Sequence, residues 1–189
     1  MFRLGIVGHR YLANTATIAF VTEQCLAILK QAQAEHTDVV ALSAIAEGAD
    51  TLFAEAALEV NVPLEIVRPF DDYASDFTTR SARRRYEKLR GAARSESRLA
   101  HPARSDSAYR AAMDWIVRRA DVLVVAWDGL PAMGSGGTGD AVKQAVLLKR
   151  PWLHLDVTNL SVTVHPAGPH TEKGRAELDV NPTHNSGSR

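Results

Sequence analysis

A glycine-rich stretch carries the residue types best suited to holding a ligand. It follows an apolar run at 121–127, and its glycines can adopt positive φ and leave space for a bound group. The next helix would begin near Thr138, and the N–H groups at a helix N-terminus favour anions. The pattern predicts a phosphate-binding site at the following residues: Gly129, Gly136, Gly137, Thr138 and Gly139.

Two carboxylates flank this stretch and are the candidate catalytic groups. Asp128 comes directly after the apolar run, where a charged side chain is rarely part of a core. Asp140 would lie in the first turn of the following helix, where the helix dipole alone favours an acid. Catalysis by Asp128 or Asp140 and simple helix stabilisation by Asp140 both remain open.

Gly8, His9 and Arg10 follow the first apolar run of the chain. Arg10 could pair with a phosphate, and His9 could hydrogen-bond a ligand or act as an acid or base. Alternatively, Gly8 only turns the chain and Arg10 pairs with a nearby acid. Gly5 and Gly8 lack the third glycine of the dinucleotide fingerprint, so the sequence does not support an ordinary NAD site.

Glu47, Gly48 and Asp50 follow the second apolar run. Gly48 would allow a ligand to approach the backbone closely, and Glu47 could contact a ribose hydroxyl or a base. Asp50 could contact the ligand as well, although it is also a suitable N-cap for the helix that follows. We expect these residues to belong to the same ligand site.

Apolar runs typical of buried strands alternate with segments of helical periodicity. This alternation predicts an α/β fold with a single doubly wound, mainly parallel, Rossmann-like sheet and helices on both faces. The residues after parallel strands should then meet at one edge, where ligands bind. Expected strands are 2–8, 38–46, 63–69, 121–127, 151–157 and 160–164; expected helices are 15–35, 50–60, 81–94, 107–120 and 139–149; 95–105 is expected to be a loop.

The composition is that of one ordinary globular domain. The chain has 189 residues, of which 46% are hydrophobic and 23% charged. We expect the domain to span 1–164 and 165–189 to be a weakly ordered tail, because that segment is poor in large apolar residues. The single cysteine excludes a disulfide framework, and neither a transmembrane span nor a signal peptide is visible, so a cytoplasmic protein is the default expectation.

Charge is distributed unevenly although the net charge is zero. Between Arg80 and Arg119 lie twelve Lys or Arg residues and four acidic ones. A solvated helical face is the favoured interpretation, and nucleic acid is not expected as a partner. One or two of these arginines could instead reach a ligand phosphate. The seven histidines show no metal-binding spacing, so we expect neither a metal nor a cofactor.

Three segments together resemble the SLOG superfamily of Rossmann-like nucleotide-binding domains, which includes the Smf and LOG proteins. They are GIVGHR at 5–10, LSAIAEGAD at 42–50 and the glycine-rich stretch within 126–142. The resemblance implies a nucleotide or nucleotide-derived ligand at the strand ends, and it raises the possibility of a homo-oligomer. LOG hydrolases carry a catalytic glutamate after their glycine loop, where this chain has Ala141 or Lys143, depending on the alignment.

Two functions are compatible with the site residues, and a third class, a nucleic-acid-binding module that uses the basic segment, stays open with a steep salt dependence of binding as its signature. The first is nucleotide binding through the glycine-rich loop, as in a sensor. The second is a hydrolase or transferase that acts on the N-glycosidic bond of a nucleoside monophosphate or related nucleotide, with Asp140 or Asp128 at the reacting centre.

Overall fold

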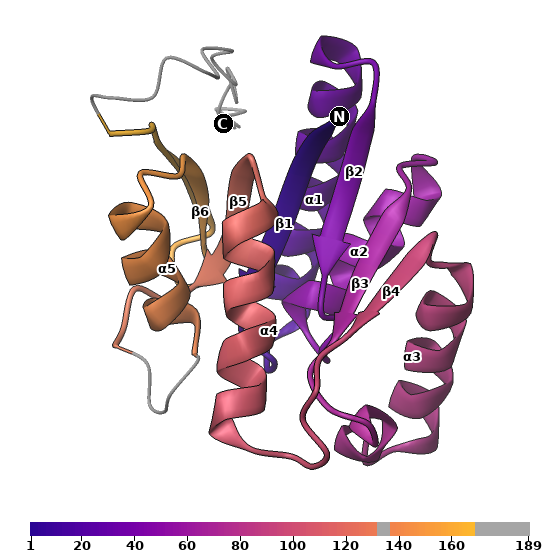
Figure 1. Ribbon diagram of the computed structural model, residues 1–189. Helices are drawn as coiled ribbons and strands as arrows, with labels where there is room; N and C mark the ends of the chain where they lie inside the picture. The colour runs from indigo at the N-terminus through magenta and orange to yellow at the C-terminus, as the bar shows by residue number, and fades with distance from the viewer. Residues whose placement is uncertain (132–136, 169–189) are drawn as a thin grey trace.

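A seven-stranded sheet forms the centre of the molecule, as the computed structural model of residues 1–131 and 137–168 describes it (Figure 1). The strand order is β4-β3-β2-β1-β5-β6-β7; β1 to β6 run parallel and β7 pairs antiparallel with β6. The predicted doubly wound, mainly parallel sheet is therefore confirmed. The strands are Phe2–Gly8 (β1), Val39–Ser43 (β2), Leu64–Arg68 (β3), Ser95–Arg98 (β4), Val122–Trp127 (β5), Trp152–Asp156 (β6) and Ser161–His165 (β7).

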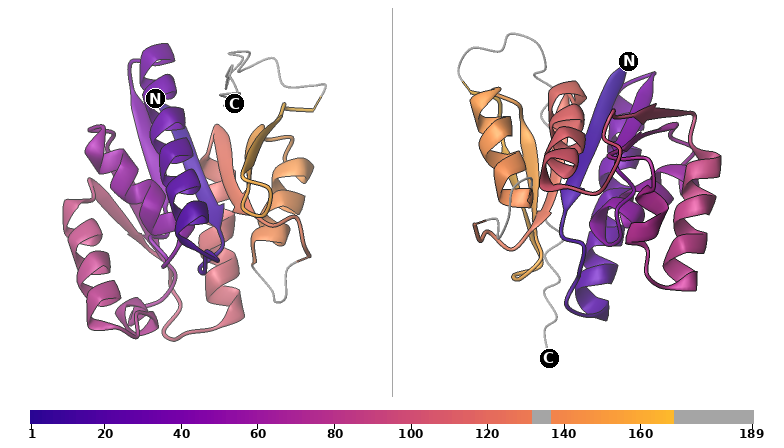
Figure 2. Two further views of the ribbon diagram at one scale, coloured as in Figure 1. Left: turned by 180° about the vertical axis from the view of Figure 1, so that it is seen from behind. Right: turned by 60° about the horizontal axis from the view of Figure 1, so that its bottom comes forward.

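Helices cover both faces of the sheet. The views from the front and from behind show α1 and α2 packed on one face and α4 and α5 on the other (Figures 1 and 2). Each face buries its own apolar cluster, because alternate residues of β1 and β5 point to opposite sides. The helices are Thr15–Glu35 (α1), Ala49–Glu59 (α2), Arg80–Ala92 (α3), Asp106–Arg119 (α4) and Thr138–Leu147 (α5), with a short 3₁₀ helix at Tyr73–Asp76 (η1).

The glycines of β1 let two helices approach the central strand. A Cβ on Gly5 would lie 2.8 Å from Cγ2 of Ile116, so α4 can pack directly against β1 only at a glycine. A Cβ on Gly8 would lie 2.6 Å from Cβ of Ala49, at the start of α2. Both glycines are thus needed for packing, and the close approach of α2 brings its first turn to the end of β1.

One predicted loop is partly a strand. Residues 95–105 were expected to be irregular, yet Ser95–Arg98 pairs in parallel with β3 as the edge strand β4. Its sequence, SESR, contains no apolar residue, so hydrophobic periodicity could not reveal it. Pairing with β3 and ion pairs to neighbouring arginines hold it in place.

The C-terminal end of the described chain extends past β7. His165, expected to begin the tail, is the last residue of this strand, and 169–189 lie outside the described residues. Within residues 1–131 and 137–168, no helix is both long enough and apolar enough to span a bilayer.

Candidate functional site

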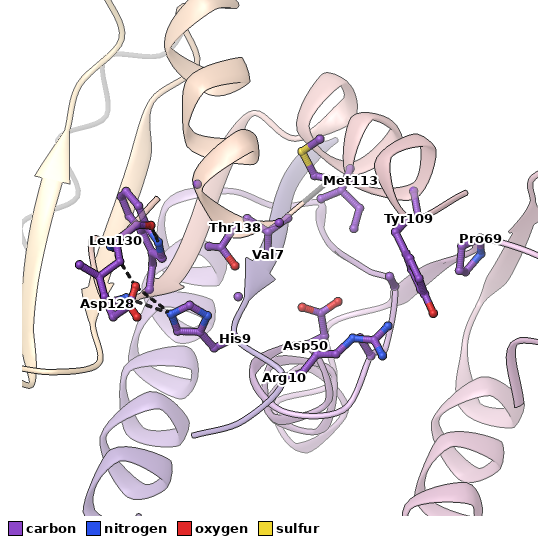
Figure 3. Close-up of a pocket in the computed structure, with 18 of the residues that line it drawn as sticks. Val7, His9, Arg10, Asp50, Pro69, Tyr109, Met113, Asp128, Leu130 and Thr138 are labelled. Carbon is purple, nitrogen blue, oxygen red and sulfur yellow. Dashed lines mark hydrogen bonds and ion pairs between the residues drawn. The ribbon is translucent and has the colours of Figure 1, made fainter. Parts of the chain in front are cut away.

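A cavity of about 570 Å³ opens at the carboxyl ends of the parallel strands (Figure 3). It lies where β1 and β5 are neighbours and the chain winds outward in both directions, which is the usual ligand position in such sheets. Its volume falls in the range of small-molecule sites, roughly 300–1,000 Å³. Eight of the residues predicted for the site line it: Gly8, His9, Arg10, Asp50, Asp128, Gly137, Thr138 and Gly139.

Other predicted residues have different surroundings. Of the described residues, Glu47, Gly48, Gly129 and Asp140 are not part of the cavity lining, and Gly136 lies outside the described residues. Gly48 has φ +94°, and a Cβ there would lie 2.3 Å from the carbonyl oxygen of His9. Gly48 therefore lets α2 begin directly against the loop after β1. This contact positions the backbone around the cavity, although Gly48 itself does not line it.

Asp140 lies in the first turn of α5, as expected, and its carboxylate forms ion pairs with two basic side chains. Its Oδ1 is 3.2 Å from Nζ of Lys143, and its Oδ2 is 3.6 Å from Nη2 of Arg110 on α4. These ion pairs connect α5 to α4. The N-cap of α5 is Gly137, so the helix begins with backbone groups at the cavity.

His9 and Asp128 form one edge of the cavity. Nε2 of His9 lies 3.1 Å from Oδ1 of Asp128, and the backbone N–H of Leu130 donates to the same oxygen at 3.0 Å. Desolvation raises the pKa of the Asp128 carboxyl, but the hydrogen bonds from Leu130 and His9 outweigh it and keep this pKa below its ordinary value. Asp128 is thus a carboxylate at neutral pH, tied to the end of β1 through His9.

Asp50 is not the N-cap of α2, although its position in the sequence would suit that role. The N-cap of α2 is Gly48, and Asp50 lies in the first turn with its side chain directed into the cavity (Figure 3). The residue is only 6% exposed. Burial raises the pKa of the Asp50 carboxyl to about 7, although Arg10 and backbone hydrogen bonds from Ala46 and Ala44 act in the opposite direction. A buried acid that titrates near neutrality inside a cavity is a common feature of functional sites.

A polar cluster around Asp76 forms the opposite wall. Arg10 donates from Nη2 to Oδ2 of Asp76 at 3.1 Å, and Tyr109 donates from its hydroxyl to the same oxygen at 2.5 Å. Nε of Arg104 lies 3.6 Å from the other oxygen, Oδ1. The side chain of Asp76 is 2% exposed, so one buried carboxylate holds two arginines at the cavity.

This cluster around Asp76 could hardly be predicted from the amino-acid sequence. In the sequence, Tyr109 shares a helical stripe with Ala112, Met113 and Ile116, which is typical of core positions, and Asp76 lies in a connection without recognisable periodicity. The structure instead places the Tyr109 ring 4.9 Å from the guanidinium carbon of Arg10. Only the tertiary fold brings η1, the residues before α4 and the end of β1 together.

The remaining wall is apolar. Val7 from β1, Pro69 after β3, and Ala112, Met113 and Ile116 from α4 line it. An amphipathic molecule therefore fits this cavity: charged groups can meet the arginines or the start of α5, while a flat apolar part packs against α4. Among the described residues, no group of three or more potential ligands could hold a metal ion.

Comparisons with known proteins identify the fold. No protein-family model matches the chain, and no curated protein matches it. DNA processing protein A (DprA) from Streptococcus pneumoniae is similar in structure, with a TM-score of 0.58 and 16% identity over 82% of this chain and 50% of that one. DprA from Helicobacter pylori gives 0.55 and 16% identity over 81% and 64%. The protein TM1055 gives 0.52 and 14% over 80% and 72%.

These similarities show the fold: the chain is a Rossmann-like α/β domain that shares its architecture with these proteins. It spans half the length of the Streptococcus pneumoniae protein and less than two thirds of the Helicobacter pylori protein.

The comparisons also correct one expectation. Nucleic acid was not expected as a partner, because the basic segment was interpreted as a solvated helical face. The Helicobacter pylori neighbour, however, binds single-stranded DNA. A fold of this architecture can therefore serve a nucleic-acid-binding protein, and the expectation that nucleic acid is not a partner was wrong.

Proposed function

We propose that this chain binds a nucleotide or nucleotide-derived ligand in the cavity at the strand ends. The observation that carries the proposal is the convergence of the start of α5 (Gly137, Thr138 and Gly139), Arg10 and Asp50 on one cavity at the switch point of the sheet. The start of α5 suits a phosphate, because backbone N–H groups and the helix dipole favour negative charge there. Arg10 adds a cation, and Asp50 adds an acceptor for hydroxyl or amino groups.

Equilibrium dialysis against a panel of mononucleotides, NAD, ADP-ribose and cyclic nucleotides tests this proposal. Mass spectrometry should find an intact nucleotide retained by the protein. Gly137→Val should abolish that retention, because its side chain would enter the space at the start of α5. Gly91→Val is the matched control, since the surroundings of Gly91 on α3 are open. Release of free base would instead show cleavage of the N-glycosidic bond and direct attention to Asp128.

Single-stranded nucleic acid is a second candidate ligand for the same cavity. The DNA-binding neighbour with this fold favours it, together with the two arginines, Arg10 and Arg104, that line the cavity. Fluorescence anisotropy with a labelled single-stranded oligonucleotide distinguishes the candidates. Competition between the oligonucleotide and a retained mononucleotide would place both in this cavity, and independent binding would place the strand elsewhere.

A further inference from the structure

The cavity offers two places suited to anions, and they lie on opposite sides of it. Thr138, at the start of α5, lies on the side of His9 and Asp128, whereas the guanidinium of Arg10 lies across the cavity beside Tyr109 (Figure 3). A mononucleotide with a single phosphate can occupy only one of these places with its charge.

The arginine side is assembled before any ligand arrives. Asp76 fixes Arg10 and Arg104 together, with contacts of 3.1 Å and 3.6 Å to its two oxygens. Two guanidinium groups against one carboxylate leave a net positive charge. Both arginine side chains are partly exposed, at 35% for Arg10 and 67% for Arg104. Each guanidinium has five N–H donors, so donors remain for a second anion.

The middle of the cavity suits an uncharged group. Asp50 points into it and can accept hydrogen bonds from hydroxyl groups, whereas a phosphate beside this buried carboxyl would be repelled whenever the carboxyl is ionised. Ala112, Met113 and Ile116 of α4 provide an apolar surface on which a base could pack. From the start of α5 to Arg10, the cavity therefore offers an anion site, then a region suited to a sugar and a base, and then a second anion site.

We infer that the cavity selects a nucleoside flanked by two phosphates, with one at the start of α5 and the other at Arg10 and Arg104. A nucleoside 3′,5′-bisphosphate and an internal nucleotide of a single strand share this chemistry. The inference rests on the proposed function and adds the second phosphate to it.

Calorimetric titration with the 5′-monophosphate, 3′-monophosphate and 3′,5′-bisphosphate of each of the four common nucleosides tests the inference. For at least one base, the bisphosphate should bind at least tenfold more tightly than the better monophosphate. Arg104→Ala should remove this advantage. Arg98→Ala should leave this advantage intact, because Arg98 pairs with Asp71 on the surface and does not line the cavity.

The outcomes separate the inference from the proposed function. A monophosphate that binds as tightly as its bisphosphate overturns the inference alone, as does an Arg104→Ala variant that keeps the bisphosphate advantage. Failure of every nucleotide to bind overturns the proposed function as well. A trinucleotide that binds more tightly than the bisphosphate assigns the site to a strand, and one that binds more weakly assigns it to a small molecule.

Discussion

Burial gives Asp50 a carboxyl group that responds to pH near neutrality. Its folded-state pKa of about 7 lies above the ordinary value of 3.8, so between these values the folded protein holds more protons than the unfolded chain. The free energy of unfolding should therefore fall as pH rises from about 4 to 7. Ligand groups that donate hydrogen bonds should prefer the ionised form, and anionic groups the protonated form.

Asp50→Asn should make the protein more stable relative to wild type at pH 8 than at pH 5. The difference should be on the order of 1–3 kcal/mol, because the folded carboxyl holds its extra proton over about two pH units between pH 5 and its pKa of about 7, at about 1.4 kcal/mol each. Urea unfolding at the two pH values measures it. The exposed acid Asp72 supplies the control variant Asp72→Asn, and identical pH dependence in wild type and Asp50→Asn would contradict the assignment.

Gly48 and Gly129 form a matched pair for separating backbone strain from steric overlap. Both have positive φ, at +94° and +81°, but only Gly48 has atoms where a Cβ would stand. Gly129→Ala should cost about 1 kcal/mol of unfolding free energy through strain alone. Gly48→Ala should cost at least about 3 kcal/mol, because the loop after β1 must move. Equal losses in denaturant titrations would show that Gly48 does not position this loop.

At the scale of single residues, the sequence could identify side chains next to strand ends but could not identify their partners. Gly8, Arg10 and Asp128 were singled out because each follows an apolar run, and each lines the cavity. Asp76 and Arg104 were not, because no local pattern marks a side chain whose role depends on residues far along the chain.

At the scale of elements, helices and buried strands were predictable because their apolar patterns are long. The edge strand β4 was not, since its pairing depends on charged contacts. Glu96 of β4 lies 3.0 Å from Nε of Arg68 on β3 and 2.6 Å from Nε of Arg90 on α3. Both arginine contacts reach the same partly buried carboxylate, so β4 is held between β3 and α3.

Glu96→Gln should loosen β4. Loss of the carboxylate leaves two arginines without their common partner, and we expect a loss of about 1–3 kcal/mol in unfolding free energy, with faster amide exchange in β4. Hydrogen–deuterium exchange checks the second effect. Glu87→Gln removes an acid that lies 3.7 Å from Arg90 within α3 and should change little. Unchanged exchange in Glu96→Gln would mean that backbone pairing alone holds the strand.

At the scale of the whole molecule, the basic segment is partly neutralised by acids from other elements. Arg85 pairs with Glu55 of α2, Arg94 with Glu65 of β3, and Arg98 with Asp71. The long-range charge imbalance seen in the sequence is therefore weaker in the folded protein. The doubly wound order could be predicted from alternating elements, whereas this neutralisation depends on which elements become neighbours.

Because of this neutralisation, we expect the affinity for a single strand bound in the cavity to depend only weakly on salt concentration. Contacts to about two phosphates give a slope of roughly −1.4 in log affinity against log salt concentration. Anisotropy titrations over a range of sodium chloride concentrations measure the slope. A value several times steeper would contradict binding through the cavity and indicate the exposed basic face of α3.

The central claim is that the cavity between the start of α5 and Arg10 is the ligand site. Amide chemical-shift mapping of the isotope-labelled protein, titrated with the nucleotide retained in dialysis, tests it most directly. The account predicts that the largest shifts fall on Gly8, Arg10, Asp128, Thr138 and Gly139. Shifts centred on the exposed face of α3, at Arg84 and Lys88, would contradict it.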